Sequence, residues 1–259
     1  MNSLLIKLLV CFVAGAGAGI GTGFAGMSAA VVISPMLITF LGMEAYQAVA
    51  IALASDVLAS AVSAVIYKKN NNIDIRHGLV MMVTILCFTL VGSFISSFIP
   101  STTMSWFSLA MTVFLGLKFL FFPVMTTREH RDLIPPKMRL AGSIIAGIWI
   151  GLVCGFIGAG GGLMILFVLT VLLGYDLKCA VGTSVFIMSF TAFTGAASHF
   201  AIGGLSDPVS LVLCIIFTLI WAQLAARFAN HADPKLLNHV TGAVLVILGI
   251  IMIIVNYVI

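Results

Sequence analysis

The chain has 259 residues, of which 62% are hydrophobic and only 8% are charged, and its formal net charge is +4. With a mean hydropathy of +1.25, this composition excludes a soluble globular protein and leaves no room for a soluble catalytic or nucleic-acid-binding domain. Apolar stretches of about 18 residues or more fill nearly the whole chain, as is typical of transmembrane helices. We therefore expect an all-α membrane protein that crosses the lipid bilayer many times.

Charged and turn-forming residues divide the chain into ten hydrophobic segments. They are residues 4–23, 25–41, 46–67, 78–99, 104–123, 138–156, 159–173, 179–201, 208–226 and 237–257. Residues 128–137 contain several charges and two prolines, so we interpret them as a linker. The linker separates a first membrane repeat, residues 1–127, from a second, residues 138–259.

The two halves carry the same glycine pattern, 132 positions apart. The matching positions are Gly15, Gly19, Gly23, Phe24, Gly26 and Gly42 in the first half and Gly147, Gly151, Gly155, Phe156, Gly158 and Gly174 in the second. Since each half has an odd number of segments, the second half enters the membrane from the opposite side, which makes an inverted repeat. Duplicated, glycine-interrupted hydrophobic segments indicate the binding site of a transporter. Small residues at every fourth position also let transmembrane helices pack closely, and the two interpretations are compatible.

The orientation in the membrane follows from the distribution of Lys and Arg. If the linker is cytoplasmic, 11 of the 12 Lys and Arg residues fall on or near the cytoplasmic side, and only Lys7 lies outside. Positive residues are enriched in cytoplasmic loops of membrane proteins. We therefore expect a cytoplasmic linker and both termini on the outer side.

The junction between the first two segments of each half has an unusual composition. Residues 23–29 and 155–162 contain no charge and almost no turn-forming polar residues. Irregular backbone at membrane depth is tolerated only where it is buried in protein or lines a cavity. We expect each half to open with a glycine-rich hairpin, made of a broken or re-entrant helix, whose tip lies inside the protein.

The tip of the second hairpin is the strongest candidate for an anion site. It consists of Gly158, Ala159, Gly160, Gly161 and Gly162. A helix start leaves its first amides unsatisfied and carries the positive end of the helix dipole, so it binds anions without a lysine. The corresponding tip of the first half offers Gly26, Met27 and the hydroxyl of Ser28. The alternative is a tight turn between packed helices.

Asp56 is the only acidic residue deep within a predicted span. An intramembrane carboxylate is costly, so a functional role is the default hypothesis. We predict that Asp56 couples transport to a proton, or binds a cation that accompanies the substrate. The alternative is a structural carboxyl group that is hydrogen-bonded to Ser55, to Ser60 or to a neighbouring helix.

Hydroxyl groups follow the second tip on the eighth segment. Thr183 and Ser184 are placed to add donors for a tetrahedral oxyanion, and we include both in the candidate substrate site. For any single hydroxyl in a helix, a hydrogen bond to its own backbone is the commoner role. His199 aligns with Tyr67 in the repeat, and we interpret it as structural rather than as a proton relay.

Signatures of cofactor, metal and enzyme sites are missing from the sequence. The five cysteines have no metal-ligand spacing, and neither a Gly-x-Ser-x-Gly nor a His-Glu-x-x-His motif occurs. We expect no cofactor, no metal and no enzymatic activity.

Several motifs together resemble the TauE/SafE family of sulfite exporter-type membrane proteins over nearly the whole chain. They are Gly23-Phe24-Ala25-Gly26, Gly155-Phe156-Ile157-Gly158-Ala159-Gly160-Gly161-Gly162, Pro35, Ala48-Val49-Ala50, Ala180-Val181-Gly182-Thr183-Ser184 and Asn72-Ile73-Asp74. The first tip departs from the family pattern, because Met27, Ser28, Ala29 and Ala30 stand where more glycine is usual. The resemblance implies passage of sulfur-containing anions, such as sulfite or organosulfonates, across a bacterial inner membrane, with both termini then in the periplasm.

We therefore predict a secondary transporter of small sulfur-containing anions with a central anion site. Its expected partners are the anion, the lipid bilayer and protons as the coupling ion, and no nucleic acid. Two other classes remain open. A passive anion channel would conduct without coupling and would not need Asp56, and a membrane scaffold or sensor would transport nothing.

Overall fold

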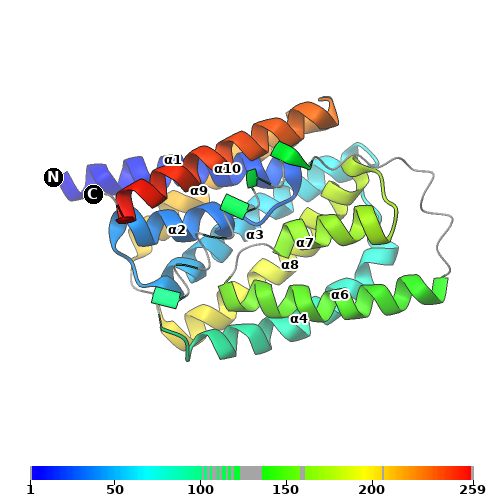
Figure 1. The fold of residues 1–259 in the computed structure, drawn as a ribbon, viewed down its shortest axis with the longest axis horizontal. Coiled ribbons are helices and arrows are strands. Elements are labelled where there is room, and N and C mark those ends of the chain that lie inside the picture. The colour runs from blue at the N-terminus through cyan, green and yellow to red at the C-terminus, as the bar shows by residue number, and fades with distance from the viewer. Residues whose placement is uncertain are drawn as a thin grey trace.

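A computed structural model of the chain describes residues 2–100, 136–157, 161–205 and 207–257, together with scattered positions between 102 and 122. Every regular element in these residues is a helix (Figure 1). The all-α prediction is therefore confirmed. The linker up to residue 135 and most of the predicted fifth segment lie outside the described residues.

The described helices follow the predicted segments closely. In chain order they are α1 (Asn2–Ala25), α2 (Ala30–Leu41), α3 (Ala45–Lys69), α4 (Ile75–Ser96), α6 (Pro136–Ile157), α7 (Gly161–Phe167), the π-helix η2 (Val168–Leu172), α8 (Leu177–Gly203), α9 (Pro208–Ala229) and α10 (Pro234–Tyr257). Boundaries agree with the prediction to within a few residues, although α6 already begins at Pro136, inside the stretch predicted as linker. Within the described part of the chain, five stretches are long and apolar enough to cross a membrane: Leu4–Ala25, Ala45–Lys69, Gly78–Ser96, Leu177–Gly203 and Pro208–Ala229.

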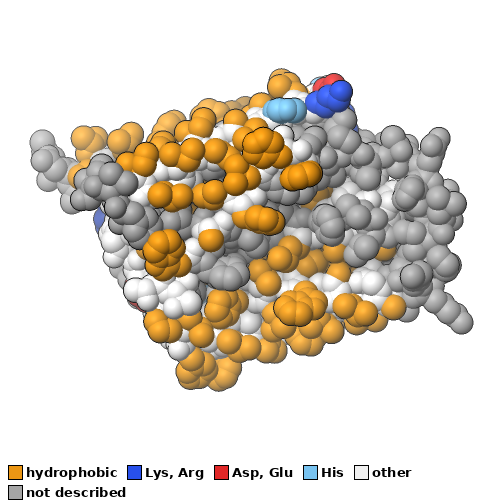
Figure 2. All heavy atoms as spheres, viewed as in Figure 1, with side chains coloured by type: hydrophobic (Ala, Val, Ile, Leu, Met, Phe, Trp, Pro, Cys, Tyr) orange, Lys and Arg blue, Asp and Glu red, His pale blue; other side chains and the backbone are white. Residues whose placement is uncertain are grey.

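The outer surface of this bundle is strongly apolar. Figure 2 shows hydrophobic side chains over much of the described face. Large side chains such as Trp149 on α6 and Phe94 on α4 are 68% and 58% exposed. Soluble monomers rarely expose apolar patches of this extent, whereas lipid tails accept them. The surface is that of a multi-pass protein embedded in a membrane.

The main helix contacts join the two predicted halves. The most extensive are those of α1 with α9, α4 with α6 and α3 with α8. In Figure 1, α4 and α6 lie together along the lower edge, while α1 and α9 lie together near the upper edge. Each pair contains one helix from residues 1–127 and one from residues 138–259, so the core forms mostly between the halves.

The glycines at four-residue spacing lie in two of these contacts. Gly15, Gly19 and Gly23 of α1 face α9, and Gly147, Gly151 and Gly155 of α6 face α4. A Cβ at Gly19 would lie 2.7 Å from the backbone nitrogen of Ala222, and one at Gly151 would lie 2.6 Å from the carbonyl oxygen of Ile85. Only glycine allows this close approach of the backbones. For these six positions, the interpretation as helix packing is confirmed.

A further pair of duplicated glycines ends corresponding helical segments. Gly42 follows α2 with φ +62° and donates its amide to the carbonyl of Leu37. Gly174 follows η2 with φ +69°. Glycine is the residue that most readily adopts this left-handed conformation. The glycine at this position is therefore required by the backbone in both halves.

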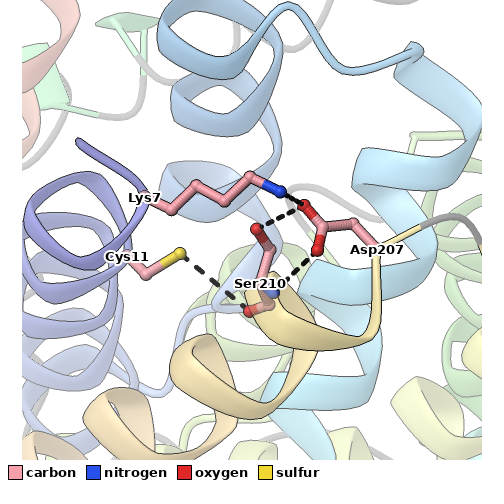
Figure 3. A network of polar contacts seen from close by, with 4 residues as sticks. All are labelled: Lys7, Cys11, Asp207 and Ser210. Atoms are coloured by element: carbon pink, nitrogen blue, oxygen red, sulfur yellow. Dashed lines mark hydrogen bonds and ion pairs between the residues drawn. The ribbon is translucent and has the colours of Figure 1, made fainter. Parts of the chain in front are cut away.

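An ion pair ties the beginning of α1 to the beginning of α9 (Figure 3). Lys7 Nζ lies 2.6 Å from Asp207 Oδ2. Asp207 is also the N-cap of α9, since it accepts hydrogen bonds from the amide and the hydroxyl of Ser210. Partial burial by itself raises the pKa of the Asp207 carboxyl, but the bonds from Lys7 and Ser210 outweigh burial and hold that pKa below its usual range.

Replacing Asp207 by Asn is expected to destabilise the protein in a pH-dependent way. Lys7 remains 34% exposed, so solvent screens the pair and the loss at neutral pH is at most about 1 kcal/mol. A carboxyl group with a lowered pKa stabilises the fold above its unfolded pKa of about 4, and this contribution is lost as the pH falls through the folded pKa.

Thermal unfolding of the detergent-solubilised protein checks this expectation. The difference in melting temperature between the wild type and Asp207→Asn should shrink on acidification. Lys7→Gln should show the same pH dependence. A difference of the same size at acidic and neutral pH would contradict the electrostatic origin.

Candidate functional site

The two glycine-rich tips meet in the interior of the protein. The first tip, residues 26–29, connects α1 to α2 and is buried. Of the second tip, Gly161 and Gly162 begin α7, whereas Gly158, Ala159 and Gly160 lie outside the described residues. A Cβ added to Gly162 would overlap the carbonyl oxygen of Gly26 and lie 2.9 Å from the Cα of Met27. The tips are therefore in direct backbone contact.

Ser184 of α8 bridges the two tips. Its hydroxyl oxygen lies 2.9 Å from the carbonyl oxygen of Gly26 and 2.9 Å from that of Gly162. A hydroxyl has one proton to donate, so the two carbonyls share it or alternate. Sequence reasoning placed Ser184 at the site, and the structure brings it to both tips. To bind an anion, this hydroxyl must turn its proton away from the carbonyls.

The amides of the first tip are largely used by the protein itself. Gly26, which has φ +60°, donates its amide to the carbonyl of Thr22, and Met27 donates to the carbonyl of Gly21. The amide of Ala30 donates to the Ser28 hydroxyl. The first tip therefore has fewer amides available for a ligand than its position at a helix start suggests.

Asp56 lies beside the first tip. It is completely buried in α3, and its Oδ1 accepts a hydrogen bond of 2.7 Å from Ser60. The Ser28 hydroxyl and the Ala29 amide are also near the carboxyl group. Its other oxygen, Oδ2, has no hydrogen-bond partner among the described residues. No cation pairs with Asp56 in the described part of the chain.

The predicted alternatives for Asp56 are partly resolved by these contacts. Ser60 is a hydrogen-bond partner, as the structural interpretation predicts. Ser55 is not, since its hydroxyl donates to the carbonyl of Ile51 in its own helix at 2.9 Å. Asp56 is therefore supported by Ser60 and by groups of the first tip, while its Oδ2 has no hydrogen-bond partner among the described residues.

The corresponding position of the second half holds Met188, next to the second tip. A Cβ at Gly161 would lie 3.5 Å from Met188 Sδ and 3.0 Å from Cys154 Sγ. Gly161 corresponds to Ala29, and Met188 to Asp56, at the repeat distance of 132. A carboxyl group therefore faces the first tip, and a neutral thioether faces the second.

Thr183 points away from this centre. Its Oγ1 accepts a hydrogen bond of 3.0 Å from the amide of Asp74, in the connection between α3 and α4. Its methyl group lies near Gly78 at the start of α4. The structure thus brings Ser184 to the tips but not its neighbour, and a role of Thr183 in anion binding stays a prediction.

Two further buried polar side chains, Ser63 and Tyr67, follow Asp56 along α3. The Tyr67 hydroxyl donates to the carbonyl of Gly23, at the end of α1, with a distance of 3.0 Å. Ser63 is completely buried and its hydroxyl has no partner among the described residues. The spacing of Ser63 and Tyr67 from Asp56 places all three side chains on one face of the helix. This spacing is visible in the sequence.

His199 sits elsewhere, at the other end of α8. Its Nδ1 lies 2.9 Å from the carbonyl of Gly195 and 2.8 Å from the hydroxyl of Ser93. Its ring stacks on Tyr46 with centroids 4.4 Å apart. These contacts fit the structural interpretation of His199, and it does not reach the tips.

Comparison with known proteins bears directly on this site. The model of the family described as sulfite exporter TauE/SafE matches residues 11–252, which include both tips and all the helices between them. The probable membrane transporter protein YunE of Bacillus subtilis is 24% identical over 95% of this chain and 94% of its own length. The probable membrane transporter protein YdhB of the same organism is 25% identical over 82% of this chain and 86% of its own.

These names describe membrane transporters rather than enzymes. No solved structure matches the chain.

The contact between the tips predicts the effect of adding one methyl group there. Gly162→Ala should push the tips apart and lower the free energy of unfolding by about 1–3 kcal/mol, as overpacking does. Gly142→Ala on α6 is the matched control, since a Cβ there has nothing within 4 Å and alanine favours helix. Thermal unfolding of the two variants should therefore shift in opposite directions, and equal melting temperatures would contradict the tight contact.

Proposed function

Because the chain belongs to the sulfite exporter TauE/SafE family, we propose that it is a secondary transporter of small sulfur-containing anions across the bacterial inner membrane. The observation that carries the proposal is the meeting of two glycine-rich tips in the buried centre, beside Ser184 and the buried carboxyl of Asp56. Binding sites of many transporters lie near mid-membrane, where helices are interrupted.

The two halves, residues 1–127 and 138–259 joined by the linker 128–137, form an inverted repeat that begins with these hairpins. Three observations support the repeat. α1 packs on α9 through its glycines as α6 packs on α4. Gly42 and Gly174 both end a helical segment with positive φ. The third is that equivalent residues, Asp56 and Met188, each face the tip of their own half.

The anion binds at the second tip, residues 158–162. There the neutral side chain of Met188 takes the place that Asp56 takes at the first tip, so no resident negative charge repels or replaces the substrate. Gly26, Met27 and Ser28 form the opposite wall. The Ser184 hydroxyl donates to the anion when it releases the carbonyls of Gly26 and Gly162. Thr183 joins the site only in a conformation in which it leaves Asp74. Amide and hydroxyl donors suit a small oxyanion such as sulfite or a sulfonate.

The linker side of the protein faces the cytoplasm, and both termini face the periplasm. Asn230, after the end of α9, is hydrogen-bonded to Asn72, after the end of α3, and to Lys178, at the start of α8. These bonds hold the three helix ends together, so their basic residues lie on one side of the protein. Lys7 is bound to Asp207 at the other end of α9. Both termini lie toward one end of the molecule (Figure 1).

Uptake into proteoliposomes tests the function. The purified protein is expected to accumulate labelled sulfite, thiosulfate or a sulfonate when a pH gradient is imposed. Flux without accumulation would identify a passive anion channel, and no flux of any of these anions would favour a scaffold or sensor.

Single cysteines at Asn2 and Thr127, in a background without native cysteines, test the orientation. A membrane-impermeant thiol reagent added to intact cells should label the cysteine at position 2 and not the one at position 127. The reverse pattern would overturn the orientation.

Asp56→Asn is expected to abolish accumulation driven by a proton gradient while exchange of substrate for substrate continues. Asparagine keeps the shape and accepts the bond from Ser60, but it does not titrate. Counterflow and gradient-driven uptake, measured in the same vesicles, separate the two steps. Asp207→Asn, which changes an acid at the start of α9, should retain both, and normal accumulation by Asp56→Asn would place the coupling elsewhere.

A further inference from the structure

One face of α3 carries four polar side chains in a row. Asp56, Ser60, Ser63 and Tyr67 are spaced by four, three and four residues, which places them one above the other on a helix. All four are completely buried. We refer to these four residues as the polar face of α3.

Simple packing does not account for this face. The Ser60 hydroxyl donates to Asp56 and the Tyr67 hydroxyl to Gly23. Asp56 Oδ2 and Ser63 Oγ, however, have no partner among the described residues. A buried polar atom without a partner costs about 1–3 kcal/mol, and such groups require an explanation in a native structure.

The polar face extends from Asp56 in one direction only. Toward the start of α3, the same face continues with Ala52, Val49 and Ala45, which are buried and apolar. Toward its end, the face leads past Tyr67 to the Lys68–Lys69 end of the helix. There Asn72 donates to Asn230 at 2.8 Å, in a partly buried polar cluster that also includes Lys178. Along α3, hydroxyl groups therefore lie between Asp56 and only one end of the helix, the Lys68–Lys69 end.

We propose that the polar face of α3 is a proton route through which Asp56 exchanges its proton with the Lys68–Lys69 end of the protein. The inference deepens the proton coupling proposed above and rests on it. A hydroxyl group both donates and accepts a hydrogen bond, so each one takes up a proton as it releases another, and only O–H bonds form and break. The Cβ atoms of residues three apart are about 5–6 Å from each other, a separation that one water molecule is able to span between Ser60 and Ser63.

Few other ionisable groups act on Asp56. From α6, the thiol of Cys154 lies within electrostatic range of the carboxyl group. From the first tip, the Ser28 hydroxyl and the Ala29 amide face it. No ion pair to Asp56 is present within the described helices, so no neighbouring cationic side chain occupies the carboxyl group in place of a proton.

Hydrogen–deuterium exchange of the Asp56 carboxyl, followed by infrared spectroscopy of the full-length protein, tests the route without any transport. The band of the protonated carboxyl is assigned by its loss in Asp56→Asn. In Ser63→Ala the exchange is expected to slow about tenfold, which corresponds to about 1.4 kcal/mol in the barrier. Ser63→Thr, which restores a hydroxyl, should return the rate to that of the wild type.

Ser55→Ala is the matched control. Ser55 is also completely buried in α3, but its hydroxyl donates to its own helix and lies on another face, so its loss should leave the exchange rate unchanged. Should Ser63→Ala not be obtained folded, Tyr67→Phe removes the next hydroxyl and carries the same expectation. Exchange at the wild-type rate in Ser63→Ala or Tyr67→Phe, or equal slowing in Ser55→Ala, would overturn the proposal.

The transport assay separates this inference from the proposed function. Ser63→Ala should slow proton flux that accompanies the substrate and leave substrate counterflow intact. A wild-type protein that moves no sulfur-containing anion would refute the proposed function, whereas the infrared experiment would still decide the proton route.

Discussion

The backbone contact between the two glycine-rich tips is the constraint on which the rest of the structure depends. A polypeptide that leaves the helical form at membrane depth must satisfy its polar groups within the protein. Here Gly162 meets the carbonyl of Gly26 with no room for a side chain, and the Ser184 hydroxyl lies within hydrogen-bond distance of a carbonyl of each tip. The helices that carry the tips, α1 with α2 and α6 with α7, therefore converge on α8 at one point.

Around this contact, the two tips are lined by different side chains. Asp56 faces the first tip, near the Ala29 amide, and Met188 faces Gly161 of the second. The positive end of a helix that lies beside a carboxyl group is already balanced by a negative charge. The positive end that lies beside a thioether is not, so it remains available to an anion. The two tips thus offer two different chemical environments, one suited to the proposed coupling ion and one to the proposed anion.

The glycine pattern has two physical causes that sequence periodicity does not separate. At Gly19 and Gly151, glycine lets neighbouring helices approach closely, and the requirement is purely steric. At Gly26, the backbone adopts φ +60° and its carbonyl accepts a hydrogen bond from Ser184. Both uses give small residues at similar spacing in an apolar stretch. The repeat was therefore visible in the sequence, but which glycines pack helices and which shape the centre was not.

Hydropathy and charge alone determined the all-helical membrane fold and nearly all the helix boundaries of the described residues. They also determined that Asp56 is isolated within a span. Each of these features depends on local sequence and on the cost of placing polar groups in lipid. Only the tertiary structure decided that Ser184 reaches both tips while Thr183 turns to Asp74, and that the amides of the first tip are already used. These contacts join residues as far apart as Gly26 and Ser184. Which way a hydroxyl or an amide points depends on the packing of helices from opposite halves, and no local pattern encodes it.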